Sequence, residues 1–141
     1  MFQPYAPTYQ KWATEIERFH PDEETVLVGH SCGGGMIVQW LSKNPQAKVG
    51  KVVLVAPWID LEKDDWPAFD FTLDPDIAKR THGLTIFHST DDVEEIQTSV
   101  KYLTDNLNDF KYVEFEGRGH FTHKYMPDDT FPELLKECLA E

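Results

Sequence analysis

Residues 26–33 read Val26-Leu27-Val28-Gly29-His30-Ser31-Cys32-Gly33 and carry the clearest indication of the fold. It joins a short apolar run, residues 25–28, to a glycine-rich turn that extends to Gly35. Short apolar runs with β-branched residues are typical of strands that are covered on both faces of a parallel sheet. Apolar residues at helical spacing follow the turn: Met36, Ile37, Trp40 and Leu41. The stretch therefore predicts a buried strand, a sharp turn and a helix.

The rest of the chain repeats this alternation of strand-like and helix-like segments. We predict further strands at residues 51–55, 84–87 and 112–115, and further helices at residues 8–19, 93–107 and 131–138. Thr8 is a candidate cap for the first helix, and Thr130 with Glu133 forms a candidate capping box for the last. Strands that alternate with helices indicate a mostly parallel sheet between two helical layers. We expect a single three-layer α/β/α domain over residues 1–141.

Composition limits the classes of partner. The 141 residues include 13 Lys and Arg against 25 Asp and Glu, which gives a net charge of −12. This acidity argues against binding to nucleic acid or to an anionic membrane, because both need clustered basic residues. Residues 1–10 lack the basic-then-apolar order of a signal peptide, and Cys32 and Cys138 make no disulfide framework. We therefore expect a cytoplasmic protein.

Three residue types with complementary chemistry follow three of the predicted strands. Ser31 lies in a G-x-S-x-G turn, Asp91 and Asp92 follow residues 84–87, and His120 follows residues 112–115. The carboxyl ends of parallel strands meet at one edge of a sheet, so we expect these side chains to lie close together. The order Ser, Asp, His is that of the α/β hydrolases. In this interpretation His120 accepts the proton of the serine and one aspartate orients the imidazole, but spacing does not separate Asp91 from Asp92.

The turn itself predicts further details. The backbone N–H of Cys32 is a candidate donor to the oxyanion, because it opens the helix after the serine. Gly29 and Gly33 are expected to leave room that a Cβ atom would fill. We interpret His30 as a structural residue of the turn and the thiol of Cys32 as inert. The histidine spacings do not match a metal site, so we expect neither metal nor cofactor.

These residues carry a family resemblance. The chain resembles the serine hydrolases of the retinoblastoma-binding protein nine and YdeN type, a small group of α/β hydrolases. The matching stretches, from about Pro4 to the C-terminus, are Val26–Ser31, Val53–Val55, Ser89–Asp92 and Gly119–Phe121. The resemblance implies hydrolysis of an ester, thioester or amide in a small acyl substrate through an acyl-serine intermediate. It assigns Ser31 as nucleophile, Asp92 as acid and His120 as base.

The sequence departs from this family in several places. His88 stands where many hydrolases have glycine, and Val93 stands where members often have proline. Family members also begin with a strand, a glycine-rich loop that supplies a second oxyanion donor, a helix and another strand, and we find none of these before Pro4. We therefore expect an N-terminally shortened domain with residues 25–28 as an exposed apolar edge, open to a protein partner or to self-association. The alternative is a catalytically weak or inactive protein-binding module, or a fragment.

Overall fold

A computed structural model describes residues 8–62 and 70–140, and within them it contains one four-stranded parallel sheet. The strands lie in sequence order, and Val28 of the first faces Val53 of the second. Their bounds are β1 Leu27–His30, β2 Val52–Val55, β3 Leu84–Ser89 and β4 Phe110–Phe115. The family expectations about the segment before Thr8 lie outside the described residues.

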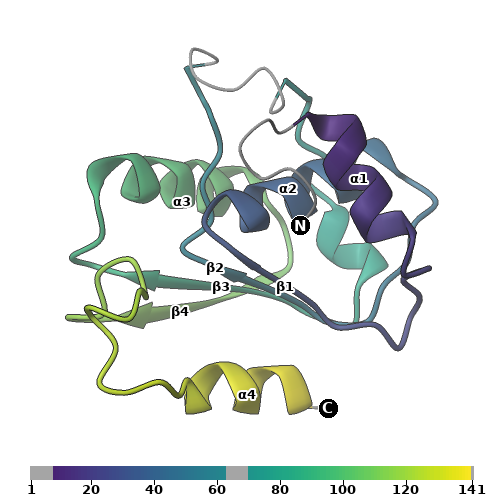
Figure 1. Ribbon diagram of the computed structural model, residues 1–141. Coiled ribbons are helices and arrows are strands. Elements are labelled where there is room, and N and C mark those ends of the chain that lie inside the picture. The colour runs from purple at the N-terminus through teal and green to yellow at the C-terminus, as the bar shows by residue number, and fades with distance from the viewer. Residues whose placement is uncertain (1–7, 63–69, 141) are drawn as a thin grey trace.

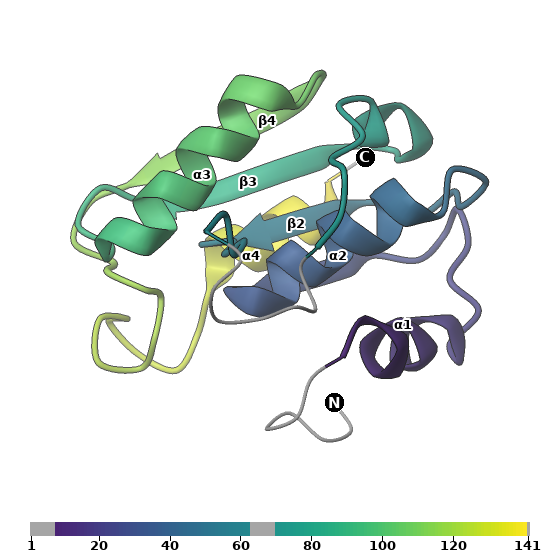
Figure 2. The same cartoon turned by 90° about the horizontal axis from the view of Figure 1, so that it is seen from above.

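The helices form two layers around this sheet. Three of them cover one face and the last covers the other, as Figure 1 shows. Their bounds are α1 Tyr9–Glu17, α2 Cys32–Lys43, α3 Glu94–Asn106 and α4 Pro132–Leu139, with a short 3₁₀ helix η2 at Ile77–Arg80. Seen from above in Figure 2, α1, α2 and α3 lie on the same side of the sheet. The predicted three-layer α/β/α order is confirmed, and no helix of the described part is long and apolar enough to cross a membrane.

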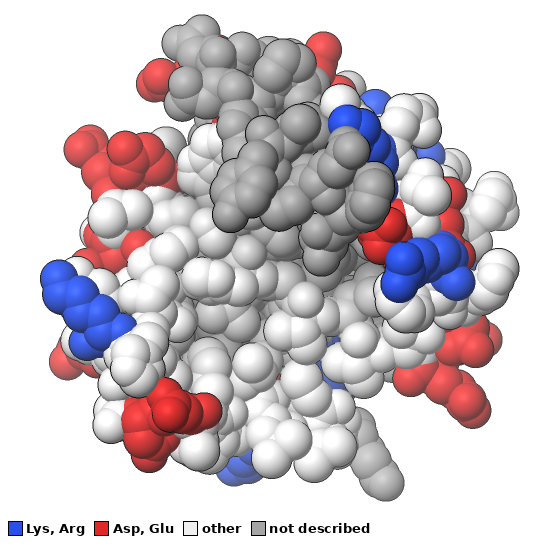
Figure 3. All heavy atoms as spheres, in the orientation of Figure 1, with Lys and Arg blue, Asp and Glu red and all other residues white. Residues whose placement is uncertain are grey.

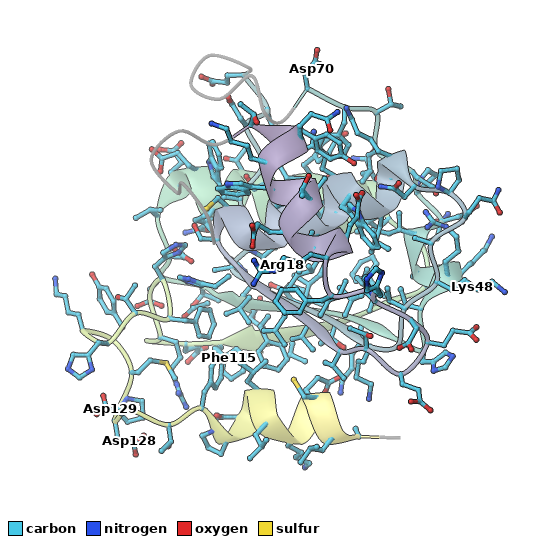
Figure 4. All side chains as sticks on the ribbon, turned by 45° about the vertical axis from the view of Figure 1, so that its right-hand side comes forward. Arg18, Lys48, Asp70, Phe115, Asp128 and Asp129 are labelled. Carbon is cyan, nitrogen blue, oxygen red and sulfur yellow. The ribbon has the colours of Figure 1, made fainter. Side chains whose placement is uncertain are left out.

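Each face of the sheet has its own apolar core. The larger core lies beneath α1, α2 and α3, where Val38 and Leu41 of α2 are fully buried. The smaller core joins β2 and β3 to α4 through Val53 and Phe87. Phe115 points from β4 toward α4 in Figure 4 and contributes to this second core. Every residue of β2 and β3 is buried, as expected for central strands of a parallel sheet.

The first strand differs from its prediction. It begins two residues later than expected and ends at His30, directly before Ser31. β1 pairs on one side only among the described residues, so Val26 and Val28 remain 41% and 46% exposed. The expectation of an exposed apolar edge is confirmed, and the expectation that this strand is covered on both faces is wrong. Figure 3 shows uncharged side chains over the centre of this view and acidic ones toward its margins.

The two predicted helix caps have different outcomes. The Thr8 hydroxyl accepts a hydrogen bond from the Lys11 N–H at 3.3 Å, so the first cap is confirmed. The capping box is wrong, because the hydroxyl of Thr130 donates to Asp128 instead. α4 begins with proline at its first turn, a residue that has no N–H to be capped there.

Candidate active site

Ser31 lies in a strained turn between β1 and α2. Its backbone angles are φ 54° and ψ −125°, a region that residues with a Cβ rarely adopt. Three hydrogen bonds hold the turn: the Ser31 N–H donates to Val55 at 3.0 Å, and the Ser31 carbonyl accepts from Trp58 and Gly34, each at 3.0 Å. The neighbouring strand and the loop after it therefore fix the serine at the carboxyl end of β1.

The glycines around Ser31 differ in how strongly they are required. A Cβ on Gly29 would lie 2.6 Å from the carbonyl oxygen of Gly33, which is a backbone clash. A Cβ on Gly34 would lie 3.0 Å from Pro57, so that glycine lets α2 approach the β2 loop closely. A Cβ on Gly33 would meet nothing within 4 Å. The steric prediction is confirmed for Gly29 and wrong for Gly33, because Gly33 already lies in the helix and faces open space.

Cys32 opens α2, and its backbone N–H belongs to the first helical turn. The first N–H groups of a helix have no partner within the helix, and their dipoles favour a negative charge close to that end of the helix. The geometry thus suits the predicted donor role of this N–H. Burial raises the pKa of the Cys32 thiol, so the sulfur stays protonated near neutral pH. A protonated thiol is a poor nucleophile, which agrees with an inert side chain.

Asp92 and His120 are in direct contact. The imidazole Nδ1 lies 3.0 Å from Asp92 Oδ2 and 3.1 Å from Oδ1. The Asp92 side chain is fully buried, whereas that of His120 is 25% exposed. An ionised carboxylate only accepts hydrogen bonds, so His120 carries its proton on Nδ1 and leaves Nε2 free to accept one. A histidine that serves as general base is held in this way, with Nδ1 on a carboxylate.

Asp92 is itself held by the start of α3. Its Oδ1 accepts the N–H of Val93 at 2.7 Å, and its carbonyl oxygen accepts from Gln97 Nε2 at 2.8 Å. The position just before a helix N-terminus favours a carboxylate, because the first amides and the helix dipole are positive there. Val93, the departure from proline, supplies one of these N–H groups.

Asp91 has a different role from its neighbour. Its Oδ1 accepts the Ser89 hydroxyl at 2.6 Å and the Gly119 N–H at 3.1 Å. The Ser89 hydrogen bond lowers the pKa of Asp91. Asp91 therefore fastens the main chain of the histidine loop, whereas Asp92 contacts the imidazole. Sequence spacing left these two residues open, and the direction of each side chain separates them.

His30 contacts the same histidine from the other side. Its Nε2 lies 2.8 Å from the carbonyl oxygen of His120, and the two ring centroids are 4.6 Å apart. Since His30 directly precedes Ser31, this contact brings the serine turn and the histidine loop together. Among residues 8–62 and 70–140, no hydrogen bond joins Ser31 Oγ to the His120 ring. Such bonds are often long before substrate binds.

His88, the other departure from the family pattern, lies outside this cluster. It is buried and lines a groove of about 730 Å³ between α3 and β4. Its Nδ1 lies 2.9 Å from the hydroxyl of Tyr112, which donates to Glu114 at 3.0 Å. Burial lowers the pKa of His88 and, with the Glu114 contact, raises the pKa of Tyr112 to about 12.

A smaller groove is lined by Trp58, a residue after β2, and by none of Ser31, Asp92 and His120. It has a volume of about 380 Å³ and runs between residues 58–62, after β2, and the first turns of α3. Trp58 links it to the site, because the Trp58 N–H donates to the Ser31 carbonyl. Four carboxylates line this groove: Asp60, Glu62, Glu94 and Glu95. In the described part of the chain, no group of three His, Cys, Asp or Glu side chains is placed to hold a metal.

Comparison with solved structures finds the same fold in several proteins. The YdeN protein of B. subtilis superposes with a TM-score of 0.77 at 22% identity, over 95% of this chain and 75% of that one. A serine hydrolase from Cycloclasticus zankles gives 0.59 at 17% identity, over 87% and 70%. A monoacylglycerol lipase from Paleococcus ferrophilus gives 0.58 at 15% identity, over 92% and 72%.

The lengths of these proteins differ from that of the chain. It spans 75% of the length of YdeN and 56% of that of a hydrolase from Thermoplasma acidophilum. A search of curated protein sequences found no match. A family model described as the alpha/beta hydrolase fold matches residues 5–99, a span that includes Ser31 and Asp92 and ends before His120. The match covers more than half of the sequence, and the chain therefore belongs to the α/β-hydrolase fold family.

Proposed function

We propose that this α/β hydrolase is a serine hydrolase that cleaves an ester, thioester or amide bond through an acyl-enzyme. Ser31 is the nucleophile, His120 the general base and Asp92 the residue that orients the imidazole. The observation that carries the proposal is the contact of the buried Asp92 carboxylate with His120 Nδ1, in a loop that touches the serine turn.

The chemistry follows from the proton positions. Ser31 Oγ attacks the carbonyl carbon of the substrate while His120 Nε2 takes the hydroxyl proton. The negative charge that develops on the carbonyl oxygen is stabilised by the N–H of Cys32 and the start of α2. Collapse of this intermediate breaks the bond to the leaving alcohol, thiol or amine, which takes the proton from His120. Water then attacks the acyl carbon while the same imidazole takes a proton from it. The bond to Ser31 Oγ breaks, the imidazole returns the proton to Oγ, and the carboxylic acid leaves.

The surroundings of the site indicate the charge of the substrate. The groove that Trp58 lines has carboxylates on both walls, from residues 58–62 and from α3, and Trp58 donates its N–H to the Ser31 carbonyl. A negatively charged acyl group would be repelled there, so we propose neutral or cationic acyl substrates. Two proteins of the same fold are described as a serine hydrolase and a monoacylglycerol lipase, which supports acyl chemistry without identifying the substrate.

We also propose that the chain acts in the cytoplasm. Both cysteines are free thiols, and Cys32 adjoins the proposed nucleophile. Free thiols of this kind persist in a reducing compartment.

The test is covalent labelling with a fluorophosphonate probe, followed by mass spectrometry of the labelled peptide. We expect the label on Ser31, no labelling of Ser31→Ala and unchanged labelling of Ser42→Ala, a control at the far end of α2. Hydrolysis of p-nitrophenyl acetate should likewise be lost in Ser31→Ala and unchanged in Ser42→Ala. A folded protein that takes up no label would refute the proposal and favour the non-catalytic binding module.

A further inference from the structure

We propose that His30 is a positioning residue, which holds the main chain of His120 and so keeps the imidazole in place against Asp92. This inference rests on the proposed function. In the sequence, His30 is recognisable only as a residue of the turn before Ser31.

The contact between the two histidines has a defined direction. A carbonyl oxygen accepts hydrogen bonds and does not donate them, so the 2.8 Å contact requires a proton on His30 Nε2. The rings also touch, with centroids 4.6 Å apart and planes tilted by 44°. His30 thus contacts both the backbone and the ring of His120, and it does so from the end of a sheet strand.

The histidine loop needs such support because of its backbone. It is an irregular segment after β4, and both neighbours of His120 have left-handed angles, with φ 47° at Gly119 and φ 52° at Phe121. Asp91 holds the N–H of Gly119 on one side, and His30 holds the carbonyl of His120 on the other. Asp92 contacts only the ring. Without His30, the carbonyl of His120 loses this hydrogen bond, and the part of the loop that carries the imidazole is held less firmly.

The charge of His30 suits this role. Desolvation lowers the pKa of His30, and the neighbouring His120 ring lowers it further, against opposing effects of the His120 carbonyl and of Asp92. A neutral His30 near pH 7 keeps its Nε2–H donor while placing no positive charge beside His120. Such a charge would oppose the imidazolium that forms on His120 during the reaction.

The first experiment measures how fast the fluorophosphonate probe labels variants of His30 at saturating probe. His30→Phe keeps a ring without a donor, His30→Gln keeps an N–H donor of similar reach, and His82→Gln is a matched control in an exposed loop at the opposite end of the sheet. The loss of one such hydrogen bond changes an equilibrium or a rate by a factor of about 5 to 10. His30→Phe should therefore lower the maximal labelling rate by about 5- to 10-fold, while the probe concentration that gives half of the maximal rate stays unchanged. His30→Gln should stay within about twofold of wild type. Equal rates in wild type and His30→Phe, or equal losses in the two His30 variants, would overturn the inference.

A second measurement, by NMR, tests the role of His30 independently of any enzymatic activity. In wild type, the Nδ1 proton of His120 should give a sharp imidazole signal by NMR, because Asp92 binds it in a fixed loop. In His30→Phe this signal should broaden through exchange with water, and in His30→Gln it should stay sharp. An unchanged signal in His30→Phe would refute the role of His30 even if Ser31 is active. Absence of labelling in wild type would refute the hydrolase and leave this readout intact.

Discussion

Replacement of Asp92 by asparagine should remove most activity while the domain stays folded. The aspartate side chain is fully buried. Both of its oxygens contact His120 Nδ1, and Oδ1 also accepts the Val93 N–H. Asparagine has nearly the same shape, but its NH₂ group would face the imidazole where an oxygen is needed. The imidazole would then place its proton on Nε2, where it can no longer accept the proton of Ser31.

The size of this effect follows from comparable sites. Loss of the correct histidine tautomer costs about 10⁴ in rate in serine proteases, which corresponds to about 5.5 kcal/mol of transition-state stabilisation. Stability should fall by only about 1–3 kcal/mol, because one charge-assisted hydrogen bond is lost in a buried position. The assay is the rate of fluorophosphonate labelling, together with a thermal melt of the same sample.

Asp91→Asn is the matched control. Asp91 accepts the Ser89 hydroxyl and the Gly119 N–H on the same oxygen, Oδ1, and the amide oxygen of asparagine can keep both bonds. We expect a loss of at most about tenfold, since both hydrogen bonds are kept and only the charge of their acceptor is lost. If Asp91→Asn loses the larger factor and Asp92→Asn stays within about tenfold of wild type, Asp91 and not Asp92 orients the imidazole.

Three further predictions concern stability, association and pH. Gly29→Ala should destabilise the fold by about 2 kcal/mol or more in urea unfolding because its Cβ meets backbone, whereas Gly33→Ala should be neutral or stabilising by up to about 1 kcal/mol. Val28→Lys at the exposed edge of β1 should reduce any self-association seen by sedimentation velocity, and an unchanged profile would argue against pairing there. The pKa of His88 is lowered in the folded protein from its ordinary value of 6.5, which the unfolded chain keeps. The unfolded chain therefore binds a proton more readily, and the free energy of unfolding should fall as pH drops through and below 6.5. His88→Gln should flatten this dependence in thermal melts between pH 7.5 and 5, and an equally steep fall would contradict it.

Much of the fold was predictable because local patterns and global topology agree. The apolar runs at 52–55 and 84–87 form central strands, and the regular spacing of apolar residues after Val93 forms α3. The strained turn at Ser31 was also predictable, since the G-x-S-x-G pattern lies between a predicted strand and a predicted helix, the context that the motif requires. Errors arose where a neighbour decides the outcome: Thr130 bonds to Asp128 rather than capping α4, and Gly33 faces open space.

The amino-acid sequence was enough to predict the residue types of the candidate site and their order, because each lies within about five residues after a predicted strand. Spacing alone could not determine which aspartate meets the imidazole, since Asp91 and Asp92 differ by one position; the family resemblance pointed to Asp92, and the side-chain directions after β3 agree with it. Nor could it show that His30 meets His120, ninety residues away in the chain. That contact exists only when β1 and the loop after β4 are brought to the same end of the sheet. Tertiary structure decides such pairings because they depend on the directions of side chains from distant segments, which no local pattern encodes.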